Sequence, residues 1–263
     1  MCETAPRLRL TTFRELPTSF AAFATSRADE CDNLHRAVIT CVKSWFKSLQ
    51  QTGEMASTEQ ERASEQINML AGRNSWPLIG DPLLRFATPQ LKSVHGIWEV
   101  KRGTRTMPAR GDFTMYDLKM VLPNLAFLSI VRDGARTRFK AKLIGSGLDK
   151  FMGGAMTGRF LDEAVPKRFA DKWIAVWTPS LESRVPTRTV GRVEFADQRF
   201  YVSETFHAPL ADDGETPDVL MLVSYFHFIN DEGERGKALA DRLMAEVGDR
   251  AALGGMRTCA PTS

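Results

Sequence analysis

The sequence contains no run of apolar residues that approaches the roughly 18 needed for a helix to cross a membrane. Its first 20 residues, MCETAPRLRLTTFRELPTSF, lack the continuous apolar segment of a secretory signal. No two of the four cysteines form a CxxC pair, and two of them, Cys2 and Cys259, lie near the ends of the chain. These absences predict a protein of the reducing cytoplasm, without membrane spans, a disulfide framework or a structural zinc site.

Signatures of common catalytic and nucleotide-binding sites are also missing. No serine lies in a GxSxG elbow. The glycine-rich segment 145–154 departs from GxGxxG at Lys150, and no Walker lysine–serine pair follows it. Only four histidines occur, of which His207 and His227 lie on neighbouring predicted strands. Such a pair could ligate a metal or haem iron, but a sheet histidine hydrogen-bonded to a neighbouring residue is the more common arrangement.

Charge is unevenly distributed along the chain. The net charge is +3, yet residues 1–90 are neutral, residues 91–159 carry +8 and residues 160–263 carry −5. This asymmetry indicates an anionic partner, two faces of opposite sign, or self-association through complementary faces. The basic stretch 101–110 has no aromatic residues between its cations, which single-stranded nucleic acid would need for base stacking. Nucleic-acid binding is therefore the less favoured interpretation.

Residues 1–90 contain few strand signals and are predicted to be an N-terminal extension, partly helical and partly disordered, with little contact with the rest. Apolar residues at three- and four-residue steps predict one helix near 32–50, capped by Asp32. Residues 50–75 are polar and lack aromatic residues, which is typical of a solvated helix or a linker. Three prolines and a glycine in 75–90 predict a boundary without regular elements.

Two short helices are predicted after this boundary. The first, at 91–102, places Leu91, Val94 and Trp98 on one face. The second, at 113–122, has Asp112 as a candidate N-cap and ends before Pro123.

A β-hairpin is predicted next. Its strands cover 125–131 and 137–145, and an Asp-Gly turn signal lies between them. Period-two alternation in the second strand places Phe139, Ala141 and Leu143 on one face and basic residues on the other.

The remaining elements are a long helix, three strands and a charged C-terminal helix. The helix at 166–181 carries an apolar stripe, and the strands cover 187–195, 199–210 and 219–229. Residues 231–263 are predicted to be a C-terminal amphipathic helix and tail. The order of elements predicts an α+β fold with a five-stranded antiparallel sheet, in which the helices between the second and third strands pack on one face.

Three patches of sequence share features with one known family. The first runs from Trp98 through RGTRTMPARGDF, and the second is LPNLAFLSIVRDGARTRFKAKLIGSGL, with Lys140 where the family usually has arginine. The third is FMGGAMTGRFLDE, with Ala155 where an acidic residue is common. Together they resemble the PAS domain family, in particular a group of alphaproteobacterial PAS proteins, over residues 91–230. The resemblance implies a PAS-like fold and a sensory or regulatory role, but it names neither a ligand nor a cofactor.

The leading hypothesis is therefore a non-catalytic PAS-type module that acts through protein–protein contacts, a second copy of the chain included. Six aromatic residues are predicted to face the space between the sheet and its helices, where they either pack as core or line a site for a small apolar ligand. These candidate ligand-binding residues are Phe127, Phe151, Trp173, Trp177, Phe206 and Tyr225. Because Trp173 and Trp177 are four residues apart on one helix, both are expected to pack against Phe206 and Tyr225.

Two alternatives remain open at this point. One is an enzyme that uses Asp162, Glu163 or His207 as acid–base groups, which would have to converge in one cleft. The other is a nucleic-acid binder that uses residues 101–110, whose affinity would fall steeply with salt. A structural role for that basic stretch is also available, because its arginines can bond backbone carbonyls or the carboxylates of Asp112 and Asp117.

Overall fold

A computed structural model describes residues 58–134, 136–154, 156–194, 201–229 and 234–254. The chain divides into two compact units, Met1–Thr52 and Gly53–Ser263, and all described residues belong to the second. The helix predicted near 32–50 lies outside the described residues. The described part of the chain contains no helix long and apolar enough to cross a membrane.

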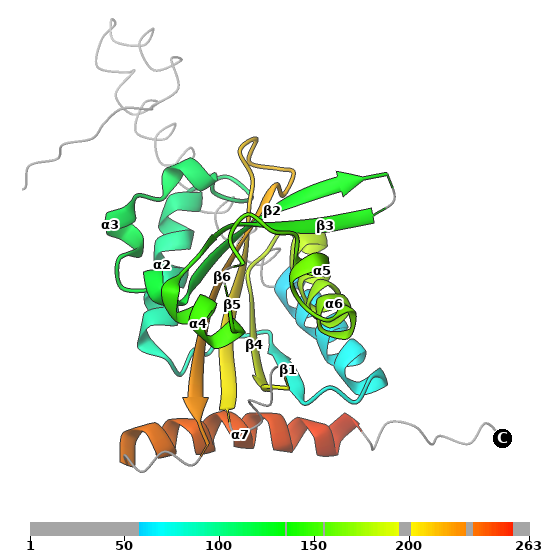
Figure 1. Cartoon of the computed structure of the whole chain (residues 1–263). Coiled ribbons are helices and arrows are strands. Elements are labelled where there is room, and N and C mark those ends of the chain that lie inside the picture. The colour runs from blue at the N-terminus through cyan, green and yellow to red at the C-terminus, as the bar shows by residue number, and fades with distance from the viewer. Residues whose placement is uncertain (1–57, 135, 155, 195–200, 230–233, 255–263) are drawn as a thin grey trace, which may run out of the picture. The chain divides into compact units, whose positions relative to one another are not determined.

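The second unit is built on one antiparallel sheet of six strands, in the order β1-β4-β5-β6-β2-β3 (Figure 1). The five predicted strands are confirmed, and β1 extends the sheet beyond β4. The fold is α+β, and its hairpin, intervening helices and three further strands follow the predicted PAS-like order. The strands are β1 (Leu78–Asp81), β2 (Leu125–Asp133), β3 (Arg136–Ile144), β4 (Thr187–Arg192), β5 (Tyr201–Leu210) and β6 (Val219–Phe228).

The segment before residue 91 contributes to the core. A helix spans the described residues 58–73 and buries Ala63, Ile67 and Ala71, and β1 pairs with β4 from Leu78↔Gly191 to Asp81↔Arg188. The expectation of an extension with little core contact is therefore wrong for residues 58–90. The helix packs through a narrow stripe of mostly small residues, and the strand has only four residues between two prolines, so neither gives a strong pattern.

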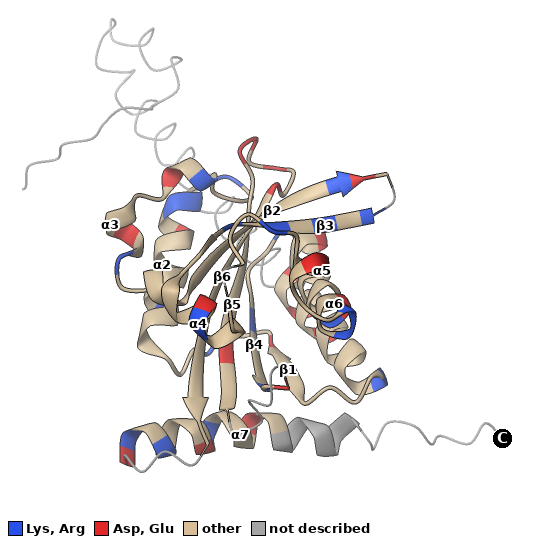
Figure 2. Cartoon of the chain, in the orientation of Figure 1, with Lys and Arg blue, Asp and Glu red and all other residues tan. Residues whose placement is uncertain are grey.

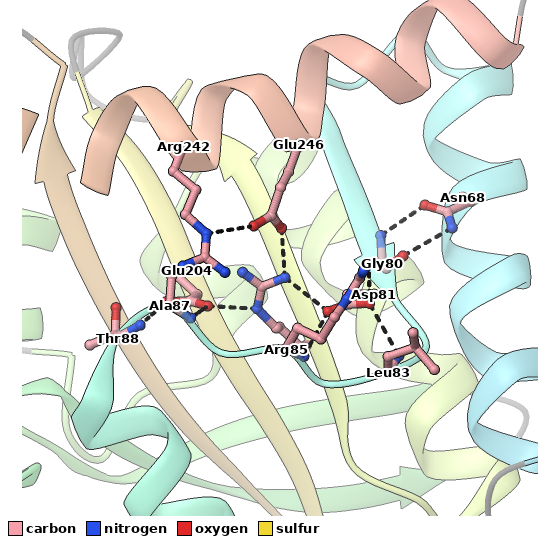
Figure 3. Close-up of polar contacts among 11 residues, drawn as sticks. Asn68, Gly80, Asp81, Leu83, Arg85, Ala87, Thr88, Glu204, Arg242 and Glu246 are labelled. Carbon is pink, nitrogen blue, oxygen red and sulfur yellow. Dashed lines mark hydrogen bonds and ion pairs between the residues drawn. The ribbon is translucent and has the colours of Figure 1, made fainter. Parts of the chain in front are cut away.

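The side chain of Asn68 occupies the free edge of β1. Its amide donates to the carbonyl oxygen of Gly80 at 3.0 Å and accepts from the Gly80 N–H at 2.8 Å (Figure 3). The amide thus forms the pair of hydrogen bonds that a neighbouring strand would otherwise form. Gly80 allows the helix to approach this closely, because a Cβ there would lie 3.1 Å from the carbonyl oxygen of Ser64.

Asn68→Ala is expected to lower the free energy of unfolding by about 1–3 kcal/mol, because it leaves partly buried backbone groups of Gly80 without partners. Urea unfolding measures the change. Asn74 follows the same helix, and its side chain makes one exposed hydrogen bond to the carbonyl oxygen of Leu70. Asn74→Ala is therefore the control and should change stability by less than about 0.5 kcal/mol. Equal effects of the two substitutions would contradict the role of Asn68.

The helices between β3 and β4 cover one face of the sheet, as predicted, together with the helix at 58–73 (Figure 1). They bury residues such as Leu148, Leu161 and Trp177 against Ala126, Leu128 and Leu222 of the strands. The elements are α4 (Ser146–Met152), α5 (Leu161–Ala164) and α6 (Lys167–Ser183).

The opposite face of the sheet is covered by one helix that precedes β2 in the chain and one that follows β6. The first predicted helix is confirmed as α2 (Pro89–Arg102), which buries Leu91, Val94 and Trp98. The predicted C-terminal helix is observed as α7 (Glu234–Gly254), and its buried Ala240, Leu243 and Val247 pack on Ile79, Val190 and Val202. The shorter elements are η2 (Arg110–Asp112), α3 (Met115–Leu118) and η3 (Leu122–Asn124).

The predicted N-cap of the second helix is wrong. α3 begins after Thr114, whose hydroxyl accepts from the Asp117 N–H, while the Asp117 carboxylate accepts from the Thr114 N–H. This reciprocal pair is a capping box. Asp112 instead accepts from the Ala109 N–H in the preceding turn.

A bulge changes the expected alternation of β3. The register between β2 and β3 shifts between Phe127 and Leu128, so that one residue of β3 lacks a partner. An extra residue reverses the side-chain alternation beyond it. Phe139 and Ala141 share the face that meets α6, and their common face was predicted. Leu143, which was predicted on the same face, packs on the opposite one.

A largely buried ion-pair cluster joins the sheet to the helices on the second face. The guanidinium of Arg188 on β4 donates to Glu204 at 2.6 Å, to Asp81 at 3.1 Å and to Glu246 at 2.8 Å. Figure 3 shows these three acids converging from β5, β1 and α7. The side chains of Arg188 and Glu204 are fully buried, and Glu246 is the most exposed acid of the three.

The acids of this cluster also bind backbone groups. Glu204 accepts from the N–H groups of Ala87 and Thr88, both at 2.8 Å, where α2 begins (Figure 3). A carboxylate at this position satisfies N–H groups and interacts favourably with the helix dipole. Burial alone raises the pKa of Asp81, but hydrogen bonds from the Arg85 and Leu83 N–H groups, with the charge of Arg188, hold it below its usual value.

Candidate functional site

A cavity of about 180 Å³ lies between the helices α4, α5 and α6 and the face of the sheet that these helices cover. The helices supply an apolar wall, and the strands supply a floor with several hydroxyl groups. The wall residues include Leu148, Phe151, Met152, Leu161, Phe169, Trp173, Val176 and Trp177.

The floor contains a row of hydroxyl side chains across three strands. The strand register places Thr189 of β4 beside Thr205 of β5, and Thr205 beside Ser224 of β6. The Thr205 hydroxyl donates to the Ser224 oxygen at 3.0 Å. The neighbouring Ser203 donates to the carbonyl oxygen of Gly191 at 3.1 Å. An apolar cavity with a few placed polar groups is the usual composition of a small-molecule site.

His207 also lines the floor, and its ring lies between two threonine hydroxyls. Nδ1 is 3.2 Å from the Thr187 oxygen, and Nε2 is 3.4 Å from the Thr189 oxygen. Burial removes the ring from water and lowers the pKa of His207 to about 3. The imidazole is therefore neutral near pH 7.

Acidification from pH 7 to pH 5 is expected to lower the free energy of unfolding by about 2 kcal/mol through His207 alone. The folded-state pKa of about 3 lies below the unfolded value of 6.5, so the unfolded chain binds a proton in this range and the folded chain does not. Urea unfolding of His207→Gln should show a correspondingly weaker pH dependence. Burial lowers the pKa of His227 as well, so His227→Gln is measured separately. An unchanged pH dependence in His207→Gln would contradict the buried neutral ring.

An ion pair lies in the wall of the cavity. Lys172 of α6 pairs with Glu194, which follows β4, and both residues line the cavity. The Lys172 side chain is 11% exposed and the Glu194 side chain 41% exposed. The amine also lies 5.5 Å from the centre of the Trp76 ring. The charges of the pair thus satisfy each other on the solvent side of the site.

The six predicted aromatic residues are divided between the two faces of the sheet. Phe151, Trp173 and Trp177 line the cavity. The other three pack on the opposite face with α2 and α3, because side chains alternate along a strand. They are Phe127, Phe206 and Tyr225, whose strand neighbours Ala126, Leu128, Thr205, His207, Ser224 and Phe226 line the cavity.

The expected packing of the two tryptophans against Phe206 and Tyr225 is consequently wrong. Trp177 instead meets Phe139 of β3 edge-to-face, with ring centres 5.2 Å apart and planes at 72°. Trp173 and Trp177 lie near each other on α6, with ring centres 6.4 Å apart. Phe151, the third predicted aromatic residue that lines the cavity, stacks on Phe226 with ring centres 3.7 Å apart.

The hydroxyl-bearing floor was missed at the level of sequence. Its signal was available in β5, where Ser203, Thr205 and His207 alternate with Glu204 and Phe206. Polar residues on alternate positions normally mark the solvent side of a strand. Here both faces of β5 are covered, so the alternation separates two buried environments.

The acid–base residues of the enzyme alternative do not converge. Asp162 and Glu163 are paired with Arg138 at 2.9 and 2.6 Å on the surface, while His207 is buried between threonines. His227 lies on the other face of the sheet from His207 and contacts Thr88. Across the described ranges, no group of three or more His, Cys, Asp or Glu residues could hold a metal ion.

The basic stretch 101–110 is largely engaged in local structure. Lys101 pairs with Asp117 at 3.0 Å and Arg105 with Asp112 at 2.5 Å, so the predicted anchoring role is observed. Arg102 pairs with Glu99, and Arg110 lies over the Phe127 ring. Figure 2 shows basic residues on α2, on the β2–β3 hairpin and on α4. Nucleic-acid binding by this stretch stays a hypothesis.

No model of a known protein family and no characterised protein sequence matches the chain. Among solved structures, the chain is similar to an RNA-binding light-oxygen-voltage receptor, with 10% sequence identity and a TM-score of 0.32. The similarity covers 86% of this chain and 72% of that chain. A TM-score this low carries no assignment of function. The order of the elements supports a PAS-like fold, and membership of the alphaproteobacterial PAS group stays a prediction.

Proposed function

We propose that the protein is a non-catalytic sensory or regulatory module whose cavity binds a small, largely apolar molecule, and which acts through contacts with protein partners. The observation that carries this proposal is the cavity between α6 and the sheet, with its apolar wall and hydroxyl-bearing floor. The predicted acids Asp162 and Glu163 pair with Arg138 on the surface, whereas His207 is buried between threonines, which favours binding over catalysis.

The size of the cavity limits the ligand. At about 180 Å³ it is slightly larger than an engineered apolar cavity of about 150 Å³ that binds benzene. Pockets for drug-sized ligands are commonly about 300–1,000 Å³. The cavity therefore suits a molecule with one small ring, and a large tricyclic or macrocyclic group would require the walls to move apart.

Contacts with protein partners are supported by exposed apolar side chains on one part of the surface. Val100 of α2 and Tyr116 of α3 are 79% and 75% exposed, and Met115 and Met120 are also exposed. The ion pair between Lys101 and Asp117 joins α2 to α3 beside them. Exposed apolar side chains that lie close together are typical of protein interaction sites.

Native mass spectrometry of the purified protein tests both the bound ligand and the protein contacts of this proposal, because it reports bound small molecules and the number of chains per assembly. The wild type should carry the added mass of one small organic molecule. Val176→Phe adds a ring from α6 into the cavity and should abolish that mass. Leu83→Phe introduces a ring at an exposed position outside the cavity and is the control. A substrate turnover that Val176→Phe abolishes would contradict a non-catalytic role.

A further inference from the structure

We infer that the ligand is a neutral one-ring molecule with a hydrogen-bond acceptor, and that this acceptor binds the hydroxyl of Ser224. The inference rests on the proposed binding function and specifies the ligand of that site. Three features carry it: the direction of the hydrogen bonds in the floor, the placement of the charges, and the shape of the walls.

Among the floor hydroxyls that bond one another or the backbone, that of Ser224 is left without an acceptor. Thr205 gives its proton to Ser224, and Ser203 gives its proton to the carbonyl oxygen of Gly191. Ser224 accepts from Thr205 and lines the cavity, but it donates to no group in the part of the chain that the structure describes. A hydroxyl carries one donor and two acceptor sites. The Ser224 proton is therefore left for a ligand, and an oxygen acceptor satisfies it.

The charges favour an uncharged ligand. The polar groups of the floor are hydroxyls and the neutral ring of His207. Two cationic residues line the cavity: Lys172 is already paired with Glu194, and Arg192 occupies the alternate position of β4, on the side of Arg188 and Val190. A carboxylate placed at Ser224 would lose its hydration without gaining a cation, which is costly in an apolar environment. A carbonyl or ether oxygen loses much less hydration.

The walls favour a flat ring. Aromatic side chains line the cavity from α4, α6 and β6, namely Phe151, Phe169, Trp173, Trp177 and Phe226. Phe151 and Phe226 are already stacked on each other, at 3.7 Å and nearly parallel. Aromatic rings pack favourably on such walls in offset or edge-to-face arrangements. One ring with a short substituent agrees with the volume of about 180 Å³.

Three probes of similar size distinguish the alternatives. Acetophenone is neutral with an acceptor, ethylbenzene is neutral without one, and benzoate is charged. Calorimetric titration of the full chain should show acetophenone binding about tenfold more tightly than ethylbenzene, the value of one buried hydrogen bond. Benzoate should bind at least tenfold more weakly than acetophenone.

Ser224→Ala should reduce acetophenone affinity about tenfold and leave ethylbenzene affinity unchanged. Ser93→Ala is the control, because Ser93 lies outside the cavity on α2 and its exposed hydroxyl donates to the Pro89 carbonyl oxygen, and it should preserve the preference for acetophenone. If Ser224→Ala does not fold, Ser224→Cys replaces it. The thiol is a weaker donor and should reduce the preference.

The outcomes separate this inference from the proposed function. Equal binding of acetophenone and ethylbenzene, or a preference that survives the loss of the Ser224 hydroxyl, would overturn the inference and leave the cavity as a binding site. Tightest binding of benzoate, abolished by Lys172→Met, would replace it with an anionic ligand. Binding of none of the three probes, with no small molecule in the native mass spectrum, would overturn both.

Discussion

Replacing Arg188 with alanine is expected to lower the free energy of unfolding by about 3–5 kcal/mol. Arg188 is fully buried and binds Glu204, Asp81 and Glu246. Removing it leaves the buried carboxylate of Glu204 without its cation and leaves buried Asp81 with Arg85 alone, at 3.3 Å. The cost of an uncompensated buried charge exceeds that of a lost contact. Urea unfolding at pH 7 measures the change.

Arg138→Ala is the matched control. Arg138 also binds two acids, Asp162 and Glu163, through short hydrogen bonds, but all three side chains are partly exposed to water. Exposed ion pairs contribute about 0–1 kcal/mol, because water solvates the partner that remains. Similar losses in the two variants would show that burial does not determine the effect.

A second substitution tests whether uncompensated buried charge causes the loss of stability in Arg188→Ala. Glu204→Gln in the Arg188→Ala background removes one of the stranded charges, so the double variant should be more stable than Arg188→Ala. A double variant less stable than Arg188→Ala would show that Glu204 acts mainly through the N–H groups of Ala87 and Thr88.

Trp177→Ala is expected to lower the free energy of unfolding by about 3–5 kcal/mol, as large-to-small changes in a core do. Trp177 is 6% exposed and packs edge-to-face on Phe139, so the truncation removes this contact and enlarges the adjacent cavity. Thermal and urea unfolding measure the loss, and titration with a one-ring probe measures binding.

Trp177→Phe keeps an aromatic ring at this position and should lose less stability than Trp177→Ala. If Trp177 only lines the cavity and is not needed for packing, the loss on truncation will be small while probe binding is abolished. A stability within about 0.5 kcal/mol of the wild type, with unchanged binding, would contradict both roles.

The cluster around Arg188 has a further consequence for the fold. One carboxylate, Glu204, connects β5, the start of α2 and β4, and Glu246 adds α7 to the same guanidinium. Buried ion pairs add little net stability compared with apolar packing but can favour one arrangement over others. We expect Arg188 to determine where α2 and α7 lie on the sheet more than it determines how much apolar surface they bury.

Most of the elements could be predicted from the sequence, because their signals are local. The apolar stripe of α6 follows the 3.6-residue period of a helix, and the hairpin of β2 and β3 has an Asp-Gly turn between two β-rich runs. β1 could not be predicted in this way. Its four residues are a strand because β4 offers them a free edge and Asn68 covers the other side.

The site was predicted in part. Trp173 and Trp177 were assigned to the space between the sheet and its helices because the spacing of the apolar stripe shows the buried face of their helix, and Phe151 was assigned with them. The strand residues Phe127, Phe206 and Tyr225 were assigned to the same space, and they lie on the other side of the sheet. Alternation shows which strand residues share a face, but it does not show which helices cover that face.

The sequence by itself determined the α+β class, the five main strands, α2 and α6, because each depends on residues within one turn or one strand. Only the tertiary structure decided which sheet face each set of aromatic residues meets, that hydroxyls form the cavity floor, and that Arg188 joins β1, β5 and α7. The physical reason is burial. Whether a Ser, an Arg or a His faces water or a partner depends on segments that are distant in the chain. When these segments pack over the side chain, they change both its hydrogen bonding and its ionisation.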